Sequence, residues 1–189
     1  MKKIILFASG SGSNVENIVH YFQGDPEIVI AAVCTNKRNA KVLDRCDRLN
    51  VPAFYFNRAA WQQESQIHNI LLSLAPDLLV LAGFLRKIPP TLIDAFPDKI
   101  INIHPSLLPK YGGKGMYGSK VHEAVKANGE TETGITVHLV NANYDEGAIL
   151  HQATTPVLPT DTVARIAEKV HQLEYAHFPR IIAALLTQT

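Results

Sequence analysis

KIILFASGSGSN, residues 3–14, joins an apolar run directly to a turn rich in glycine and serine. The run over 3–8 predicts a buried strand, and the small residues after it permit a sharp turn and a close approach of backbone to ligand. Helical periodicity begins after this turn and predicts a helix over 15–22. The chain is therefore expected to open with a strand–loop–helix unit.

The same alternation continues along the chain and predicts an α/β fold. Further strands are expected over 28–34, 53–56, 78–82 and 100–103, with helices between them over 41–49, 60–74 and 91–95. Continuous apolar strands separated by helices are typical of a parallel sheet covered on both faces. We therefore expect a doubly wound, mostly parallel sheet, a Rossmann-like arrangement.

The pattern changes after Tyr111. A helix expected over 120–127 precedes two strands, 134–140 and 148–155, which are close enough to pair as a late antiparallel hairpin. No linker or repeat divides the chain, and 189 residues suit one α/β domain.

A long final helix is predicted over 162–186. Thr160 or Asp161 can provide its N-cap, because short polar side chains satisfy the free N–H groups of a first turn. Pro179 lies inside this segment and lacks a backbone N–H, so a kink or break is expected there.

Composition narrows the class of protein. Hydrophobic residues make up 47% and charged residues 19%, as in an ordinary globular protein. The formal charge of +1, with positive residues scattered along the sequence, gives no basic face for nucleic acid, and no window is apolar enough to span a membrane. Cys34 and Cys46 provide neither a disulfide framework nor metal-ligand spacing, which favours a reducing, cytoplasmic compartment.

The turn at 9–14 is a candidate phosphate site. Gly12, Ser13 and Asn14 lie where a strand gives way to a helix, whose first N–H groups and positive dipole end favour anions. No third glycine completes a dinucleotide fingerprint, and no Walker lysine is present. The alternative interpretation is a tight turn with an ordinary helix cap.

The end of the strand at 100–103 carries the most informative side chains. Asn102 and His104 are two residues apart, so an extended strand places them on the same face, and Pro105 then ends the ladder. An amide can hold a developing oxyanion while an imidazole moves or stabilises a proton, as acyl transfer requires. The alternative is a histidine satisfied by backbone groups and an asparagine that caps the strand.

Asp145 is the candidate third member. It lies in the turn between the two late strands, and its carboxylate would favour an imidazolium at His104 and could relay a proton from an attacking amine. As an isolated residue it could equally form an Asx turn.

Four segments resemble, in order and spacing, the phosphoribosylglycinamide formyltransferases of the folate-dependent formyltransferase family. They are the turn at 9–14, Leu81-Ala82-Gly83-Phe84, the strand end at 102–109 (NIHPSLLP) and Tyr144-Asp145-Glu146-Gly147. The segment at 102–109 is specific to the folate formyltransferases, and the full set at this length points to this member of the family.

The resemblance implies a single domain over 1–189, with a phosphate- and substrate-binding half at 1–100 and a catalytic and folate-binding half at 101–189. It implies transfer of the formyl group of 10-formyltetrahydrofolate to the amine of glycinamide ribonucleotide, a step of purine biosynthesis. Direct attack of the amine, with neither a metal nor a covalent enzyme intermediate, is expected. The partners would be these small molecules, and both a monomer and a homodimer fit.

The resemblance also assigns residues by position. Asn102, His104 and Asp145 would be catalytic, and Glu174 would contact the ribose, while the phosphate would bind at Gly12, Ser13 and Asn14. The folate pocket would be formed by Leu85, Arg86, Lys87, Ile88, Asn102, Asn141, Ala142, Asn143 and Tyr144.

The sequence departs from the family at three places. Residues 112–118 read GGKGMYG where familiar members have proline-glycine-leucine and then histidine-rich residues, so this loop is expected to behave differently. A basic contact of the family falls near Ala60, where Arg58 is the candidate substitute. Lys87 occupies a position that is often apolar in the folate pocket.

Two other functions compete with formyl transfer. Hydrolysis of the same formyl-folate belongs to relatives with an extra amino-terminal domain, and a non-catalytic phosphate-binding protein could share the fold. Among the other histidines, His138 is interpreted as core packing or as a residue that reaches the site from its strand. No metal-like spacing relates the remaining ones, His68, His122, His151, His171 and His177.

Overall fold

A seven-stranded mixed sheet forms the centre of the protein, as a computed structural model that describes residues 1–62 and 66–187 shows. The strand order is β3-β2-β1-β4-β5-β6-β7; the first five strands in this order are parallel, and β6 and β7 are antiparallel to their neighbours. The predicted doubly wound sheet and late hairpin are confirmed. The strands are β1 Lys2–Phe7, β2 Ile28–Thr35, β3 Ala53–Tyr55, β4 Leu78–Leu81, β5 Ile100–His104, β6 Glu132–Leu139 and β7 Ile149–Pro156.

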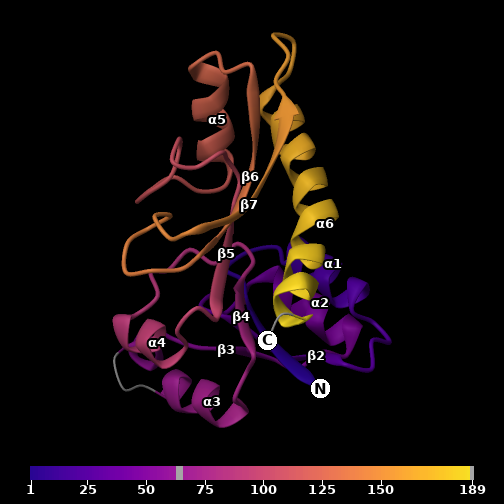
Figure 1. Ribbon diagram of the computed structural model, residues 1–189, viewed down its shortest axis with the longest axis vertical. Coiled ribbons are helices and arrows are strands. Elements are labelled where there is room, and N and C mark those ends of the chain that lie inside the picture. The colour runs from indigo at the N-terminus through magenta and orange to yellow at the C-terminus, as the bar shows by residue number, and fades with distance from the viewer. Residues whose placement is uncertain (63–65, 188–189) are drawn as a thin grey trace.

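Helices cover both faces of the sheet (Figure 1). They are α1 Ser13–Tyr21, α2 Lys41–Leu49, α3 Gln66–Leu74, α4 Pro90–Ala95, α5 Ser119–Ala127 and α6 Val163–Thr187, with a short 3₁₀ turn η1 at Ala59–Trp61. Apolar residues of α1, α2 and α6 form one core with the sheet, and those of η1, α3 and α4 form a second core on the opposite face. In the described part of the chain, no helix has the length and apolar character needed to cross a membrane.

β1 shows why its sequence is a continuous apolar run. Ile4 and Leu6 belong to the first core, whereas Ile5 and Phe7 belong to the second, and all four are at most 1% exposed. Successive side chains of a strand point to opposite faces, and here both faces are covered. The strand is therefore held rigidly at the centre of the sheet, and the turn that follows it is positioned by two cores.

The helix predicted over 60–74 is wrong in its first part. The structure has the turn η1 at 59–61, after which the backbone of Gln62 is extended, with ψ at 168°. The helix α3 begins at Gln66; residues 63–65 of the predicted helix lie outside the described residues. The Asn57 side chain accepts a hydrogen bond from the Ala60 N–H at 2.9 Å, which stabilises a turn instead of a helix start.

The final helix differs from its prediction at the start and at Pro179. Thr162, and not Thr160 or Asp161, caps it, since its side chain accepts from the Arg165 N–H at 3.2 Å. Asp161 instead accepts from the Leu158 N–H and pairs with Lys169 at 2.5 Å.

α6 continues through Pro179 without a break. Proline cannot donate to the carbonyl four residues earlier, that of Tyr175, but the Asn17 side chain of α1 donates to this carbonyl at 3.1 Å. The neighbouring Phe178 and Ile182 are fully buried against the sheet. A substitute hydrogen bond and apolar packing thus hold the helix together where the sequence predicted an interruption.

Asn17→Ala should lower the free energy of unfolding by about 1 kcal/mol, because it leaves the Tyr175 carbonyl without its donor. In a Pro179→Ala background the new N–H can bond that carbonyl, so the same change should have a smaller effect. Urea denaturation of the four proteins of this cycle measures the difference. Equal effects of Asn17→Ala in both backgrounds would contradict the substitute-donor explanation.

Candidate active site

A cavity of about 560 Å³ lies at the carboxyl ends of β1, β4 and β5. This is where open α/β sheets bind ligands, and the volume suits a small molecule. Its walls come from four segments and five further residues: 10–14, 82–85, 102–105, 113–118, His122, Tyr144, Asp145, His171 and Glu174.

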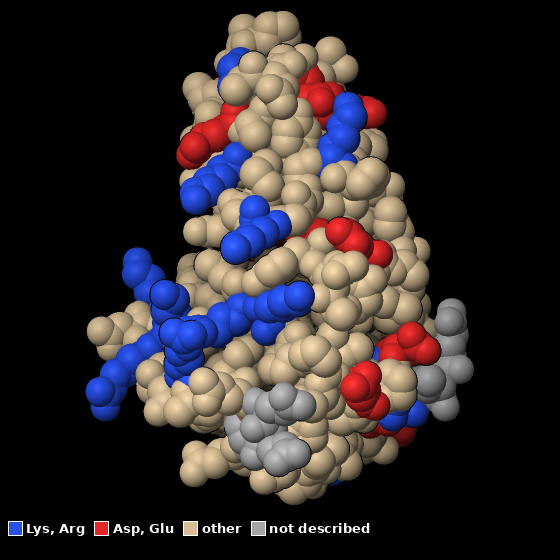
Figure 2. All heavy atoms as spheres, turned by 90° about the vertical axis from the view of Figure 1, so that its left-hand side faces the viewer, with Lys and Arg blue, Asp and Glu red and all other residues tan. Residues whose placement is uncertain are grey.

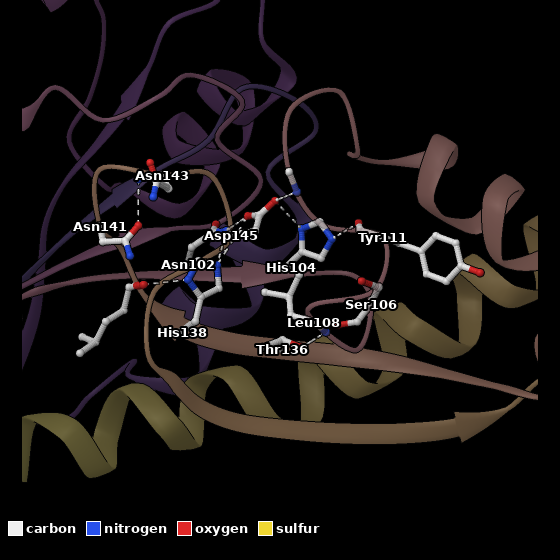
Figure 3. A network of polar contacts seen from close by, with 12 residues as sticks. Asn102, His104, Ser106, Leu108, Tyr111, Thr136, His138, Asn141, Asn143 and Asp145 are labelled. Atoms are coloured by element: carbon white, nitrogen blue, oxygen red, sulfur yellow. Dashed lines mark hydrogen bonds and ion pairs between the residues drawn. The ribbon is translucent and has the colours of Figure 1, made fainter.

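The three predicted catalytic side chains meet in this cavity. Asn102 and His104 extend from β5, and Asp145 comes from the turn between β6 and β7. One Asp145 oxygen, Oδ2, lies 3.5 Å from His104 Nδ1, and the other, Oδ1, lies 3.5 Å from Asn102 Nδ2. Figure 3 shows the Asp145 carboxylate between His104 on one side and Asn102 with His138 on the other. An amide, an imidazole and a carboxylate thus converge on one point.

The hydrogen bonds of His104 define which nitrogen can exchange a proton. Its Nε2 lies 2.7 Å from the Tyr111 carbonyl, so Nε2 carries a hydrogen, and Nδ1 is the nitrogen that faces Asp145. Burial lowers the pKa of His104, and the opposing effects of Asp145 and the Tyr111 carbonyl do not fully compensate. The resting imidazole is therefore neutral near pH 7 and has a carboxylate ready to stabilise its charged form.

Asp145 is held as a carboxylate. Burial works against ionisation, but the contact with His138, the charge of His104 and the Gly113 N–H outweigh it, so the pKa of Asp145 lies below its usual value. The Gly113 N–H donates to Oδ2 at 2.9 Å. Asp145 has a φ of 58°, a left-handed conformation that aspartate tolerates better than most residues and that directs its side chain into the site.

His138 is part of this network, although the sequence left core packing as an alternative. It lies directly opposite Asn102 in the β5–β6 pairing, is 2% exposed, and contacts the Leu139 carbonyl through Nδ1 at 2.8 Å. Its Nε2 lies 3.1 Å from Asn102 Nδ2 and 3.6 Å from Asp145 Oδ1. A neutral ring accepts from the amide, and a protonated ring donates to the carboxylate. Only the strand register, which the sequence did not give, reveals this contact.

A buried threonine supports the segment that follows His104. The Thr136 hydroxyl accepts from the Leu108 N–H at 3.0 Å and donates to the Ser106 carbonyl at 2.7 Å. Gln152 of β7 donates to the same hydroxyl oxygen at 2.9 Å. These bonds tie the turn after β5 to β6 and β7, so the strand end that carries the imidazole is fixed.

The predicted phosphate loop also lines the cavity. α1 begins at Ser13, and Gly12 has a φ of 76° that favours glycine. A Cβ at Gly12 would lie 2.4 Å from the Val42 side chain, so α2 packs directly against the loop. Asn14 Nδ2 donates to Glu174 Oε2 at 2.8 Å, which brings the predicted ribose contact of α6 beside the loop. Burial raises the pKa of Glu174.

The predicted folate residues divide into two groups. Leu85, Asn102 and Tyr144 line the cavity. The others are not among the described residues that line it: Arg86, Lys87, Ile88, Asn141, Ala142 and Asn143.

The local contacts of this second group differ from one residue to the next. Ile88 is buried in the second core, and the Asn141 side chain accepts from the Asn143 N–H at 2.9 Å to form an Asx turn. The Lys87 ammonium lies 5.9 Å from the centre of the Tyr144 ring, so the two predicted folate segments touch at the edge of the cavity.

The unusual loop at 112–118 forms one wall of the site. Gly113 and Gly115 have φ values of 92° and 93°, which explains two of its glycines.

Arg58, the candidate substitute for the family's basic contact, precedes η1 and is not among the described residues that line the cavity. Lysine and arginine side chains nevertheless gather across the left and centre of one face, although they are scattered in the sequence (Figure 2).

Two histidines at the cavity were not predicted from the sequence. His122 of α5 is 3% exposed, and its ring centre lies 6.5 Å from that of His171 on α6. In the described part of the chain, His122 Nδ1 is buried without a hydrogen-bond partner. Burial lowers the pKa of His122 to about 4, with smaller contributions from His171 and His104. The packing of α5 on α6 creates this pair.

His122→Asn should make folding less sensitive to acid. The pKa of His122 is about 4 in the folded protein and 6.5 in the unfolded chain, so the folded protein binds fewer protons between these values. This contribution to stability is complete above pH 6.5 and is lost as the pH falls through 6.5 toward 4. Urea denaturation should show a loss about 3 kcal/mol larger for the wild type than for the variant over this window. If the free energies of unfolding of the wild type and the variant change equally with pH, the low pKa of His122 is contradicted.

Comparisons with known proteins identify the family of this chain. The formyl transferase family model matches residues 2–182. Phosphoribosylglycinamide formyltransferase of Haemophilus influenzae is 38% identical over 187 residues, which cover 96% of this chain and 86% of the relative. The chloroplastic phosphoribosylglycinamide formyltransferase of Arabidopsis thaliana is 36% identical over 191 residues, which cover 97% of this chain but 65% of the relative.

Solved structures give the same result. The crystal structure of glycinamide ribonucleotide transformylase 1 from Geobacillus kaustophilus matches with a TM-score of 0.88 and 37% identity, over 98% of this chain and 99% of that one. The match therefore includes the sheet, the late hairpin and the final helix. This chain belongs to the formyl transferase family and, within it, to the phosphoribosylglycinamide formyltransferases.

Proposed function

We propose that this protein transfers the formyl group of 10-formyltetrahydrofolate to the amine of glycinamide ribonucleotide, a step of purine biosynthesis. The observation that carries the proposal is the convergence of Asn102, His104 and Asp145 in a cavity that also contains the loop at 12–14. Membership of the phosphoribosylglycinamide formyltransferases supports the choice of acceptor.

The two substrates would enter the cavity from different sides. The phosphate would bind the free N–H groups at Gly12, Ser13 and Asn14, and Glu174 would accept a hydrogen bond from the ribose. The folate would bind against Leu85 and Tyr144, with the segments at 86–88 and 141–143 at its outer edge. The amine and the formyl carbon would then meet beside Asn102 and His104.

The reaction begins when the amine attacks the formyl carbon. The new C–N bond forms while the carbonyl electrons move to oxygen, which becomes an oxyanion. Asn102 Nδ2 contacts Asp145 only at 3.5 Å, so this N–H can turn to the oxyanion. His104 can donate as well once Nδ1 has taken up a proton from solvent, which it returns when the carbonyl re-forms. The Asp145 carboxylate beside Nδ1 favours the charged imidazole at the moment negative charge develops on the substrate.

Proton transfer completes the reaction. The attacking nitrogen becomes positively charged and must lose one proton. The lowered pKa keeps Asp145 ionised, and its central position lets the carboxylate accept this proton, directly or through a water. The oxyanion electrons then re-form the carbonyl, the bond to the folate N10 breaks, and N10 receives the proton that Asp145 took from the amine. The products are formylglycinamide ribonucleotide and tetrahydrofolate, and the residues return to their resting protonation states.

An absorbance assay for folate release tests the proposal. Purified protein should form tetrahydrofolate only when both 10-formyltetrahydrofolate and glycinamide ribonucleotide are present. Release without the amine would identify a hydrolase. Calorimetric binding of both ligands without any product would identify a non-catalytic binding protein.

A further inference from the structure

His122 has an unpaired polar atom in a ring that lines the cavity. Its ring lies in the first turn of α5, lines the cavity and is 3% exposed, yet Nδ1 has no hydrogen-bond partner among the described residues. Buried polar atoms in folded proteins are nearly always paired, because an unpaired one loses its hydration without compensation. Because the ring lines the cavity, a ligand toward which the ring turns can supply the missing partner.

The surroundings of His122 connect it to the phosphate loop. The neighbouring ring of His171 is nearly perpendicular to it, at 85°, and stacks on Tyr175. Glu174 follows one helical turn after His171 and accepts from Asn14 at the start of α1. His122, His171, Glu174 and the loop at 12–14 therefore form one wall of the cavity.

This wall favours an anion. The start of α1 provides free backbone N–H groups and the positive end of a helix dipole. The neighbouring His171 lowers the pKa of His122, so an anion beside the ring is favoured over a second positive charge. Glu174 is engaged by Asn14, and burial disfavours its charged form. Other titratable groups line the cavity or belong to α5 as His122 does: His104 of β5, Lys114 and Tyr117 of the loop at 112–118, and Lys120 and Glu123 of α5.

We propose that His122 binds the phosphate group of the substrate through Nδ1, on the side opposite the first N–H groups of α1. The identity of the phosphorylated substrate rests on the proposed function, whereas the binding of phosphate to His122 does not. A negatively charged phosphate beside Nδ1 offsets the penalty for charging the buried ring, so binding should bring a proton onto His122. At pH values near the pKa of His122, substrate capture would then be coupled to proton uptake.

Inorganic phosphate tests this coupling in the wild-type protein. The imidazole nitrogens of ¹⁵N-labelled protein are followed by NMR as the pH is varied, with and without saturating phosphate. The pKa of His122, about 4 in the free protein, should rise by at least one unit with phosphate, and the signals of His151, outside the cavity, should not respond. A constant pKa of His122 overturns the proposal, whether or not the amides at 12–14 respond.

Variants of His122 test the contact during turnover. His122→Leu should raise the KM for glycinamide ribonucleotide about 10- to 100-fold, with little change in kcat or in the KM for the folate. His122→Asn keeps an N–H donor near the position of Nδ1 and should recover most of this loss at pH 7. His151→Asn, on β7, is the matched control and should change neither constant.

The two proposals fail in distinguishable ways. If the wild type transfers formyl groups and His122→Leu has an unchanged KM for the ribonucleotide, the role of His122 is wrong and the proposed function stands. If the wild type shows no turnover but phosphate raises the pKa of His122, the function is wrong and the phosphate contact stands. Since the NMR titration needs no variant, a folding defect in His122→Leu leaves the test intact.

Discussion

Asp145→Asn is expected to lower kcat about 10²- to 10⁴-fold, the usual contribution of a positioned acid–base group, while the KM of each substrate changes little. The amide oxygen of asparagine can still accept from the Gly113 N–H, so the turn should keep its conformation. The amide cannot accept the amine proton and cannot stabilise a charged His104. The loss should therefore appear in the chemical step, measured by single-turnover kinetics.

Glu146→Gln is the matched control for this change. Glu146 is exposed in the same turn, and its carboxylate contacts only the Asn143 side chain at 2.8 Å among the described contacts. The same loss of one negative charge at this position should leave kcat within a factor of about 2, as expected for a surface substitution. An Asp145→Asn enzyme with wild-type kcat would remove this carboxylate from the mechanism.

Gly147→Ala is expected to damage both stability and catalysis. A Cβ at this position would lie 1.7 Å from the Leu139 carbonyl oxygen and 2.7 Å from its carbon, so the backbone of the β6–β7 turn must move. The free energy of unfolding should fall by about 1–3 kcal/mol, as for other overpacked sites. Because the turn also carries Asp145, displacement by about 1 Å should lower kcat up to about 100-fold.

Ala148→Ser provides the comparison for Gly147→Ala. Ala148 is the next residue of the same turn and is exposed, so a hydroxyl added to its side chain has room. Denaturation curves and kcat should remain those of the wild type. If Gly147→Ala also keeps wild-type kcat while it is destabilised, the position of Asp145 does not depend on this close backbone approach.

The sheet was predictable because its strands are covered on both faces. Ile4 to Phe7 alternate between two cores, and the resulting apolar run is visible without any structure. Asn102 and His104 could also be paired from sequence, since a strand places alternate residues on one face. The residue type of Asp145 alone did not distinguish a catalytic role from an Asx turn. The family resemblance was the reason to predict the catalytic role.

The missed features depend on contacts between distant segments. His138 meets Asn102 only through the register of β5 with β6, and His122 enters the cavity only because α5 packs on α6. The continuity of α6 at Pro179 depends likewise on Asn17, 162 positions earlier in the chain. Local periodicity contains no information about such pairs.

The hydrogen bond from Gly113 to Asp145 links the cavity wall to the proposed proton acceptor. Any outward movement of the 112–118 segment would remove a donor that keeps this carboxylate ionised, so its proton affinity would increase. The position of this wall and the ionised state of Asp145 thus share a single bond. Substitutions that loosen this wall should therefore move the acid limb of the pH–rate profile to higher pH, even where they contact neither substrate.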